Sequence, residues 1–259
     1  MKDVIPGIPS IPAPPYDTVM PEQAATVQLI IWIFLAAAAL AYCGWISLRR
    51  RSWLPILIEV GAGCAMIGEA LIIHNMHCWY PVVGQQSLWK SVGASIPLLV
   101  PFAYLFYFGP VILLMMDAFE KGVSKRVFWL FYLGCMFGVT VYEIVGIAYG
   151  LHIYYGDFPF YLFGKFPLVL PFLHATLLVV PATVFYKVKN ELRGWRLWLV
   201  MPFMAGQVCG LEMWLGMPFY VAISSPVPPL WATLAGLMSI AFALGVVQFC
   251  AELVAKRRK

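Results

Sequence analysis

Residues 54–75 read LPILIEVGAGCAMIGEALIIHN, an almost wholly apolar stretch that carries a carboxylic acid, Glu69, well inside it. About 20 apolar residues are enough for a helix to cross the hydrocarbon core of a bilayer. An ionisable side chain inside that core costs roughly 3 kcal/mol on insertion scales, so it usually faces the protein interior and marks a function. We therefore expect a membrane helix that turns Glu69 toward other helices.

Six further stretches have the same apolar character, at residues 25–48, 93–116, 127–151, 167–186, 197–222 and 229–254. Hydrophobic residues make up 62% of the chain and charged residues 11%, which excludes an ordinary soluble domain. The sequence predicts an all-α, seven-helix integral membrane bundle in the cell membrane, formed by a single domain over residues 25–255. A proline-rich lead (1–24), which does not have the pattern of a signal peptide, precedes it, and a basic tail (256–259) follows.

Lysines and arginines gather in alternate connections, at residues 49–51, 121–126, 187–196 and 256–259. Basic residues concentrate on the cytoplasmic side of membrane proteins. The pattern therefore predicts a non-cytoplasmic N-terminus and a cytoplasmic C-terminus. It also explains the net charge of +5, so no nucleic-acid partner is expected.

Glu69, Glu143, His174 and Glu212 lie at similar depth in four of the predicted spans. Each is six to ten residues from the non-cytoplasmic end, which corresponds to roughly 9–15 Å at about 1.5 Å per residue. Because prolines bend three of the spans, we expect an outward-opening cavity in which these four side chains meet. The alternative is that each is a separately satisfied polar residue that holds two helices together.

Histidines and tyrosines near the same ends of the spans are further candidates. His74 and His77 are three residues apart and share a helix face, but no HExxH pattern accompanies them, so we expect unmetallated histidines that titrate near neutrality. We assign proton relay or orientation to His74 and His174. Substrate contacts are assigned to Asn75, His77, Tyr142, Tyr149, Tyr155 and Glu212.

The two long non-cytoplasmic connections, at residues 77–91 and 152–166, are rich in aromatic residues. They fit either an aromatic belt at the membrane interface or a gate over a cavity. Five of the six cysteines lie inside apolar runs, so no disulfide framework is expected. No dinucleotide, P-loop, haem or iron–sulfur spacing occurs, and we expect neither a metal nor a cofactor.

Two runs carry a resemblance to a known family. Residues 68–110 read GEALIIHNMHCWYPVVGQQSLWKSVGASIPLLVPFAYLFYFGP, and residues 141–175 read VYEIVGIAYGLHIYYGDFPFYLFGKFPLVLPFLHA. These runs resemble the integral-membrane AveC-like spirocyclases in an acidic residue followed by Asn75 and a Tyr-Pro pair, in Ser95-Ile96-Pro97, in Glu143 before Tyr154-Tyr155-Gly156, and in Phe166-Pro167. The chain departs from the family pattern at Glu69, where aspartate is as common, and at His174, where asparagine is favoured.

The resemblance implies cyclisation of a hydroxylated ketone to a spiroketal, with dehydration in some members. This chemistry suits a buried acid–base pair at a site from which water is excluded, because water would hydrolyse the cationic intermediate. We expect a cofactor-independent cyclase of a lipophilic small molecule in the lipid bilayer, with Glu143 as general acid and Glu69 as base or charge stabiliser. Two alternatives stay open: a seven-span terpenoid or carotenoid-type cyclase, and a non-catalytic lipid-binding or transport component.

Overall fold

The structure is a computed structural model that describes residues 12–255. Within that range, seven helical segments are long and apolar enough to cross a membrane, which confirms the predicted multi-pass helical bundle. Their bounds are α1 Glu22–Arg50, α2 Leu54–Cys64 continued by α3 Glu69–Asn75, α4 Val100–Lys121, α5 Lys125–Ala148, α6 Val169–Val188, α7 Val200–Ile223 and α8 Pro229–Val254. The start of the lead and the basic tail at 256–259 lie outside the described residues.

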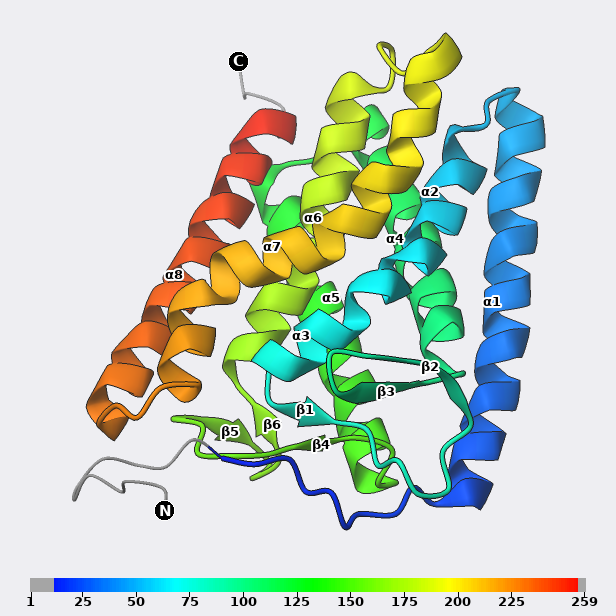
Figure 1. Cartoon of the computed structure of the whole chain (residues 1–259). Coiled ribbons are helices and arrows are strands. Elements are labelled where there is room, and N and C mark those ends of the chain that lie inside the picture. The colour runs from blue at the N-terminus through cyan, green and yellow to red at the C-terminus, as the bar shows by residue number, and fades with distance from the viewer. Residues whose placement is uncertain (1–11, 256–259) are drawn as a thin grey trace.

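Helix α6 is the centre of the bundle. Of its apolar stretch 72% is buried, against 28% in α1, α5 and α8. It packs against α4, α5, α7 and α8, whereas α1 packs on α2 and α4. Figure 1 accordingly shows α1 and α8 on opposite edges of the bundle. A residue on the inner half of α6 can therefore reach side chains from several helices at once.

The second span is not one continuous α-helix. A 3₁₀ turn, Ala65–Gly68, separates α2 from α3. Glycines allow α7 to cross closely here: a Cβ at Gly61 would lie 2.8 Å from Met204 Cβ, and one at Gly68 would lie 3.0 Å from Cys209 Cβ. The turn leaves Glu69 as the first residue of α3.

A second close approach joins α2 to α4. Glu59 is fully buried in α2, and a Cβ at Gly109 of α4 would lie 1.7 Å from its Oε2 atom. The thiol of Cys43 in α1 lies 3.8 Å from the same oxygen. Gly109 is therefore the residue that leaves space for the Glu59 side chain between three helices.

The prediction that residues 93–99 begin the third span is wrong. Helix α4 begins at Val100, and β3 (Ala94–Pro97) instead pairs with β2 (Ser87–Ser91) as an antiparallel hairpin. Positive φ angles at Val92 and Gly93 turn the chain between these strands. Proline disfavours a helical conformation in the residue before it, which explains why the helix starts beyond Pro97.

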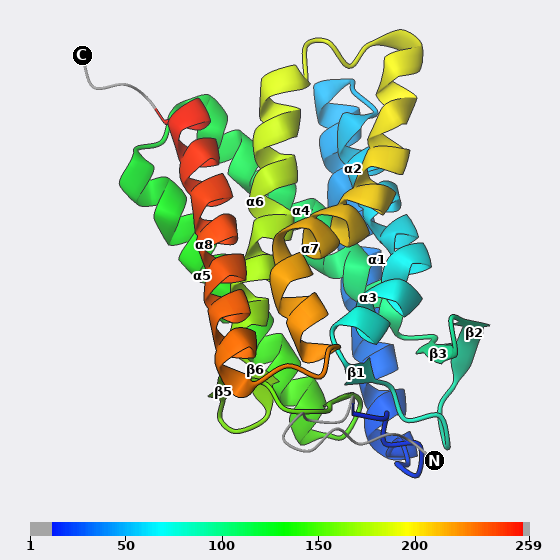
Figure 2. The ribbon, with the colours of Figure 1, turned by 60° about the vertical axis from the view of Figure 1, so that its left-hand side comes forward.

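Two further ladders change the all-helical prediction in detail. β1 (Cys78–Trp79) pairs with β4 (Ile153–Tyr154), and β5 (Tyr161–Leu162) pairs with β6 (Phe166–Pro167). Helix α6 therefore begins at Val169 rather than at residue 167, and α5 ends at Ala148 rather than at 151. Figures 1 and 2 show all the strands at one end of the bundle.

The described part of the lead lies across that same end. Met20 N donates a hydrogen bond of 2.8 Å to the carbonyl oxygen of Val83. The ring of Tyr16 meets Trp79 edge to face at 5.1 Å between centroids. Residues 12–21 and the connections 76–99 and 149–168 together form what we call the cap.

Candidate active site

A cavity of about 110 Å³ lies between the cap and the middle of the bundle. It is bordered by side chains of α1, α3, α4, α5, α6 and α7 and of the cap. All four ionisable residues that the sequence places at one depth line this cavity: Glu69, Glu143, His174 and Glu212. An engineered cavity of roughly 150 Å³ holds a benzene molecule, so this space is suited to a single small ring or to part of a larger molecule.

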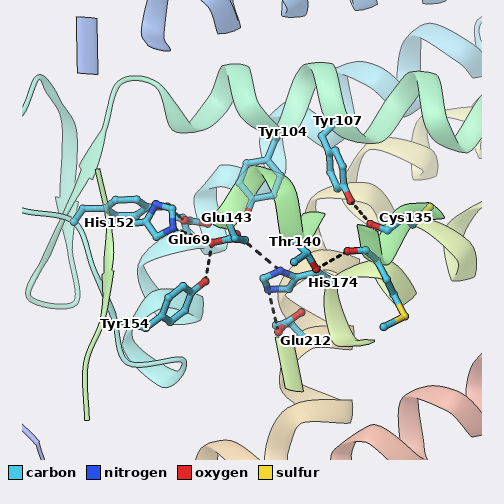
Figure 3. A network of polar contacts seen from close by, with 12 residues as sticks. Glu69, Tyr104, Tyr107, Cys135, Thr140, Glu143, His152, Tyr154, His174 and Glu212 are labelled. Carbon is cyan, nitrogen blue, oxygen red and sulfur yellow. Dashed lines mark hydrogen bonds and ion pairs between the residues drawn. The ribbon is translucent and has the colours of Figure 1, made fainter. Parts of the chain in front are cut away.

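His174, on the central helix α6, joins two of the carboxyl groups. Its Nδ1 atom lies 4.0 Å from Glu143 Oε1, and its Nε2 atom lies 3.6 Å from Glu212 Oε1. Figure 3 shows the imidazole between the two acids. Both distances exceed that of a hydrogen bond, so the ring lies beside each acid without bonding to it, and a small side-chain rotation would bring it into bonding range.

Glu143 also has two partners from the cap. Its Oε2 atom lies 2.9 Å from His152 Nε2 and accepts a hydrogen bond of 3.0 Å from the Tyr154 hydroxyl. Burial, followed by the charge of Glu143, raises the pKa of Tyr154 well above its usual value. The phenol therefore stays protonated and continues to donate.

The end of α5 explains how His152 reaches Glu143. Gly150 has a φ of +69°, and Leu151 N bonds to the Gly146 carbonyl oxygen at 2.9 Å, the arrangement that commonly ends a helix at glycine. The chain then turns back over the last turns of α5. A Cβ at Gly146 would lie 2.4 Å from His152 Cε1, so the absence of a side chain there leaves room for the imidazole.

Glu69 is held by two phenols. Tyr80 of the cap donates a hydrogen bond of 2.7 Å to Oε1, and Tyr104 of α4 donates one of 2.6 Å to Oε2. Both oxygens of this carboxyl group therefore have a hydrogen-bond partner. Burial, followed by the charge of Glu69, raises the pKa of Tyr80 well above its usual value, so this donor is also retained.

Glu212 differs from the other two acids. The hydroxyl of Tyr220 donates to its Oε1 atom, while Oε2 has no hydrogen-bond partner among residues 12–255 although the residue is 1% exposed. Gly216 makes room for the phenol, because a Cβ there would lie 2.3 Å from the Tyr220 ring. Glu212 is therefore a buried acid with one oxygen left for another donor or for a proton.

Aromatic side chains make up much of the remaining lining. Trp32 of α1 stacks on Tyr142 of α5 with ring centroids 5.3 Å apart, and Tyr142 stacks on Tyr107 of α4 at 6.4 Å. All three line the cavity, as does Phe108. The cavity thus combines an acidic cluster with a wall of rings.

Several residues assigned to the site from the sequence lie elsewhere. His74 is exposed, Tyr149 is 61% exposed, and the side-chain nitrogen of Asn75 donates a hydrogen bond of 2.7 Å to the Leu71 carbonyl oxygen. None of these three lines the cavity. The structure therefore gives them no contact with the cavity in which proton relay or substrate binding would take place.

His77 and Tyr155 are brought together, but in the cap. Their rings stack with centroids 5.1 Å apart, and His77 Nε2 lies 3.1 Å from Ser224 Oγ. Burial, and then the neighbouring His74, lowers the pKa of His77 to about 4. The prediction that this histidine titrates near neutrality is wrong, because the ring is packed in the cap rather than solvated at the interface.

His152, Tyr80, Tyr104, Tyr154 and Tyr220 were not assigned to the site from the sequence. Their partners identify them only in three dimensions, although all of them except Tyr220 lie in the two runs that carry the family resemblance. Within residues 12–255, no group of three or more His, Cys, Asp or Glu side chains is arranged to hold a metal ion.

Comparisons with protein-family models, with curated proteins and with solved structures give no match to this chain. The fold and the site define a multi-pass helical membrane protein with an acidic, aromatic-lined cavity closed by a cap. The resemblance to spirocyclases remains one of short sequence runs, and the function is argued from the cavity.

Proposed function

We propose that this protein is a membrane-embedded acid–base cyclase of a lipophilic oxygenated substrate, similar to spiroketal cyclases and dehydratases. The observation that carries the proposal is the position of His174 between two buried acids, Glu143 and Glu212, at the lining of one cavity. A general acid and a general base in hydrogen-bonding reach of one bound group each contribute typically 10²–10⁴-fold to a rate.

Spiroketal formation needs the steps that such a pair supplies. One hydroxyl of a dihydroxyketone adds to the ketone to give a hemiketal. The acid then protonates the hemiketal hydroxyl, the C–O bond breaks and water leaves. The second hydroxyl attacks the resulting oxocarbenium carbon and gives its proton to the base. The balance is one dihydroxyketone converted to one spiroketal and one water, with no change in oxidation state.

The three carboxyl groups suit different steps. Glu212 is our choice for the acid, because one of its oxygens is unpaired. Glu143 is our choice for the base, and His174 returns the proton from Glu143 to Glu212 after each cycle. Glu69, which accepts from two phenols, stabilises the cation as a fixed negative charge. This differs from the sequence-based expectation, in which Glu143 is the acid and Glu69 its partner.

The aromatic lining favours a second candidate, a terpenoid or carotenoid-type cyclase. Ring faces such as those of Trp32 and Tyr142 attract a developing carbocation as well as an oxocarbenium ion. An acid that protonates an epoxide or an alkene would then replace the one that protonates a hemiketal. The substrate that is turned over separates the two candidates.

Glutamine replacement of either acid tests the proposal. The purified protein in lipid nanodiscs is given a set of aliphatic dihydroxyketones and, separately, epoxidised isoprenoids, and products are followed by mass spectrometry. We expect spiroketal formation to fall at least about 100-fold in Glu212→Gln and in Glu143→Gln, the lower end of general acid–base effects.

Glu59→Gln is the matched control, because it changes a fully buried carboxylate that does not line the cavity. Its turnover is expected to equal that of the unmodified protein. Turnover of epoxides alone would support the second candidate. Equal turnover in all three variants would reject the roles given to Glu143 and Glu212, whereas absence of any turnover would support a non-catalytic lipid-binding or transport component.

We further propose that the cap lies on the non-cytoplasmic side of the cell membrane. The support is the gathering of lysines and arginines in the connections at the opposite end of the bundle. Fused to the C-terminus in a bacterial host, a fluorescent protein is expected to fluoresce and alkaline phosphatase to be inactive. Phosphatase inserted after the exposed Gly164 of the cap is expected to be active, and the reverse pattern would contradict this orientation.

A further inference from the structure

We propose that the cavity is a binding site for an organic cation, specifically a protonated cyclic amine with an apolar substituent. The ammonium group would lie among the carboxyl groups and its hydrocarbon against the aromatic wall. The inference goes beyond the proposed cyclase activity, because binding of a cation is measured without turnover.

The cavity is lined by more carboxyl groups than cationic side chains. Three carboxyl groups line the cavity, whereas the cationic side chains available to them are the imidazoles of His152 and His174. No lysine or arginine within residues 12–255 lines it. Even with both imidazoles protonated, one carboxylate has no cationic counterpart. An uncompensated buried charge is strongly unfavourable, so the acid must either hold a proton or meet a cation from outside the protein.

The carboxyl oxygens of the cavity differ in the hydrogen-bond donors that they have. Both oxygens of Glu69 accept from phenols, and Glu143 Oε2 accepts from Tyr154 and contacts His152. Glu143 Oε1 has only the imidazole of His174, at 4.0 Å, and the buried Glu212 Oε2 has no donor in the described part of the chain. The N–H group of a protonated amine is a charge-assisted donor of the kind that this oxygen lacks.

Much of the cavity wall is aromatic. Rings of Trp32, Tyr104, Tyr107, Phe108 and Tyr142 line the cavity. A cation within about 6 Å of such a ring is attracted by its quadrupole, by up to roughly 2 kcal/mol when desolvated. Aromatic walls with nearby carboxylates are therefore selective for a cation over a neutral molecule of the same shape.

The volume of the cavity limits the size of the ligand. The cavity volume of about 110 Å³ is smaller than the roughly 150 Å³ that holds benzene, so a single six-membered ring is the upper limit and enters only with adjustment of the lining side chains. A piperidinium ring meets this limit. Its alkyl substituent would extend along the apolar lining.

The test compares a cation with its neutral isostere. The protein in nanodiscs is titrated at pH 7 with 1-butylpiperidine, which is protonated, or with butylcyclohexane, and the thermal unfolding midpoint is followed. A ligand that binds only the folded state raises the midpoint with concentration. We expect the amine to bind at least tenfold more tightly than the hydrocarbon. Equal stabilisation by the two would overturn the inference.

Two variants of residues that line the cavity, and one control variant, locate the binding site. Glu212→Gln is expected to weaken amine binding at least tenfold, whereas Glu59→Gln is expected to leave it unchanged. Tyr142→Leu, which keeps all the charges, is expected to weaken it several-fold through loss of one ring. Unchanged affinity in Glu212→Gln would place the amine elsewhere and sink the proposal. If Glu212→Gln does not fold, the comparison of the two ligands on the unmodified protein still decides.

The outcome is distinguishable from that of the cyclase proposal. Turnover of a dihydroxyketone without selective amine binding would leave the cyclase standing and reject the cation site. Selective amine binding without turnover of any substrate would do the reverse. If both hold, 1-butylpiperidine is expected to act as a competitive inhibitor, because its charged ring resembles a cyclic oxocarbenium ion.

Discussion

Replacement of Gly109 by leucine is expected to remove nearly all folded protein. A Cβ at this position would lie 1.7 Å from Glu59 Oε2 and 2.8 Å from its Cδ atom, and the Glu59 backbone is only 3.2 Å away. Extra atoms in a packed core cost about 1–3 kcal/mol. Displacing the carboxyl group into hydrocarbon adds roughly 3 kcal/mol on insertion scales. The sum is comparable to the lower end of the folding free energies of domains, about 5–15 kcal/mol.

The measurement is the monodisperse fraction recovered after detergent extraction, with the thermal midpoint of whatever remains. Gly206→Leu is the matched control, because nothing lies within 4 Å of a Cβ at that exposed glycine of α7. Its recovery is expected to equal that of the unmodified protein. In a Gly109→Ala background, Glu59→Ala is expected to restore part of the lost stability. Normal recovery of Gly109→Leu would show that α2 and α4 do not pack as described.

Replacement of Gly146 by alanine is expected to disconnect His152 from Glu143. The added Cβ would lie 2.4 Å from His152 Cε1 and 2.9 Å from Nδ1, so the imidazole must move away from its position 2.9 Å from Glu143 Oε2. Breaking a buried ion pair by loss of one partner costs about 3–5 kcal/mol when the remaining charge is uncompensated. We expect a lower thermal midpoint and, if the protein is a cyclase, at least about a tenfold fall in turnover, below the effect of removing the base itself.

Gly138→Ala serves as the control, because this glycine lies in the same helix and nothing stands within 4 Å of a Cβ there. A double-mutant cycle gives the decisive comparison. If the alanine acts through the imidazole, Gly146→Ala should cost little more once His152 is already alanine, because interacting residues are non-additive. Full additivity of the two changes would reject the coupling.

The sequence was sufficient for the spans and for the depth of the acids. Runs of apolar length and the basic connections predict the seven segments, and helical rise places Glu69, Glu143, His174 and Glu212 at one level. The start of the third span was missed because residues 93–99 are as apolar as a helix, and periodicity alone does not separate a buried strand from a buried helix. Strands of two residues, such as β1 and β4, depend on tertiary pairing and leave no local pattern.

The partners of the acids were harder to predict than the acids themselves. A carboxyl group in an apolar run is conspicuous, whereas the tyrosines at 80 and 154 have the composition of an interfacial belt. His152 was read only as part of an aromatic connection, and its role follows from the turn at Gly150 and the space at Gly146. His74 and Tyr149 lie outside the cavity, since being near the end of a span does not fix which way a side chain faces.

The pairing of acids and phenols also bears on how the chain enters the bilayer during synthesis. Each acid has a donor encoded shortly downstream: Tyr80 is 11 residues after Glu69, Tyr154 is 11 after Glu143, and Tyr220 is 8 after Glu212. Each acid can therefore form its hydrogen bond to the downstream tyrosine when its own helix is inserted, before the later helices are in place. His174, on the fifth span, follows Glu143 and precedes Glu212 in the chain, so the acidic cluster is complete only when the sixth span, with Glu212 and Tyr220, has been inserted.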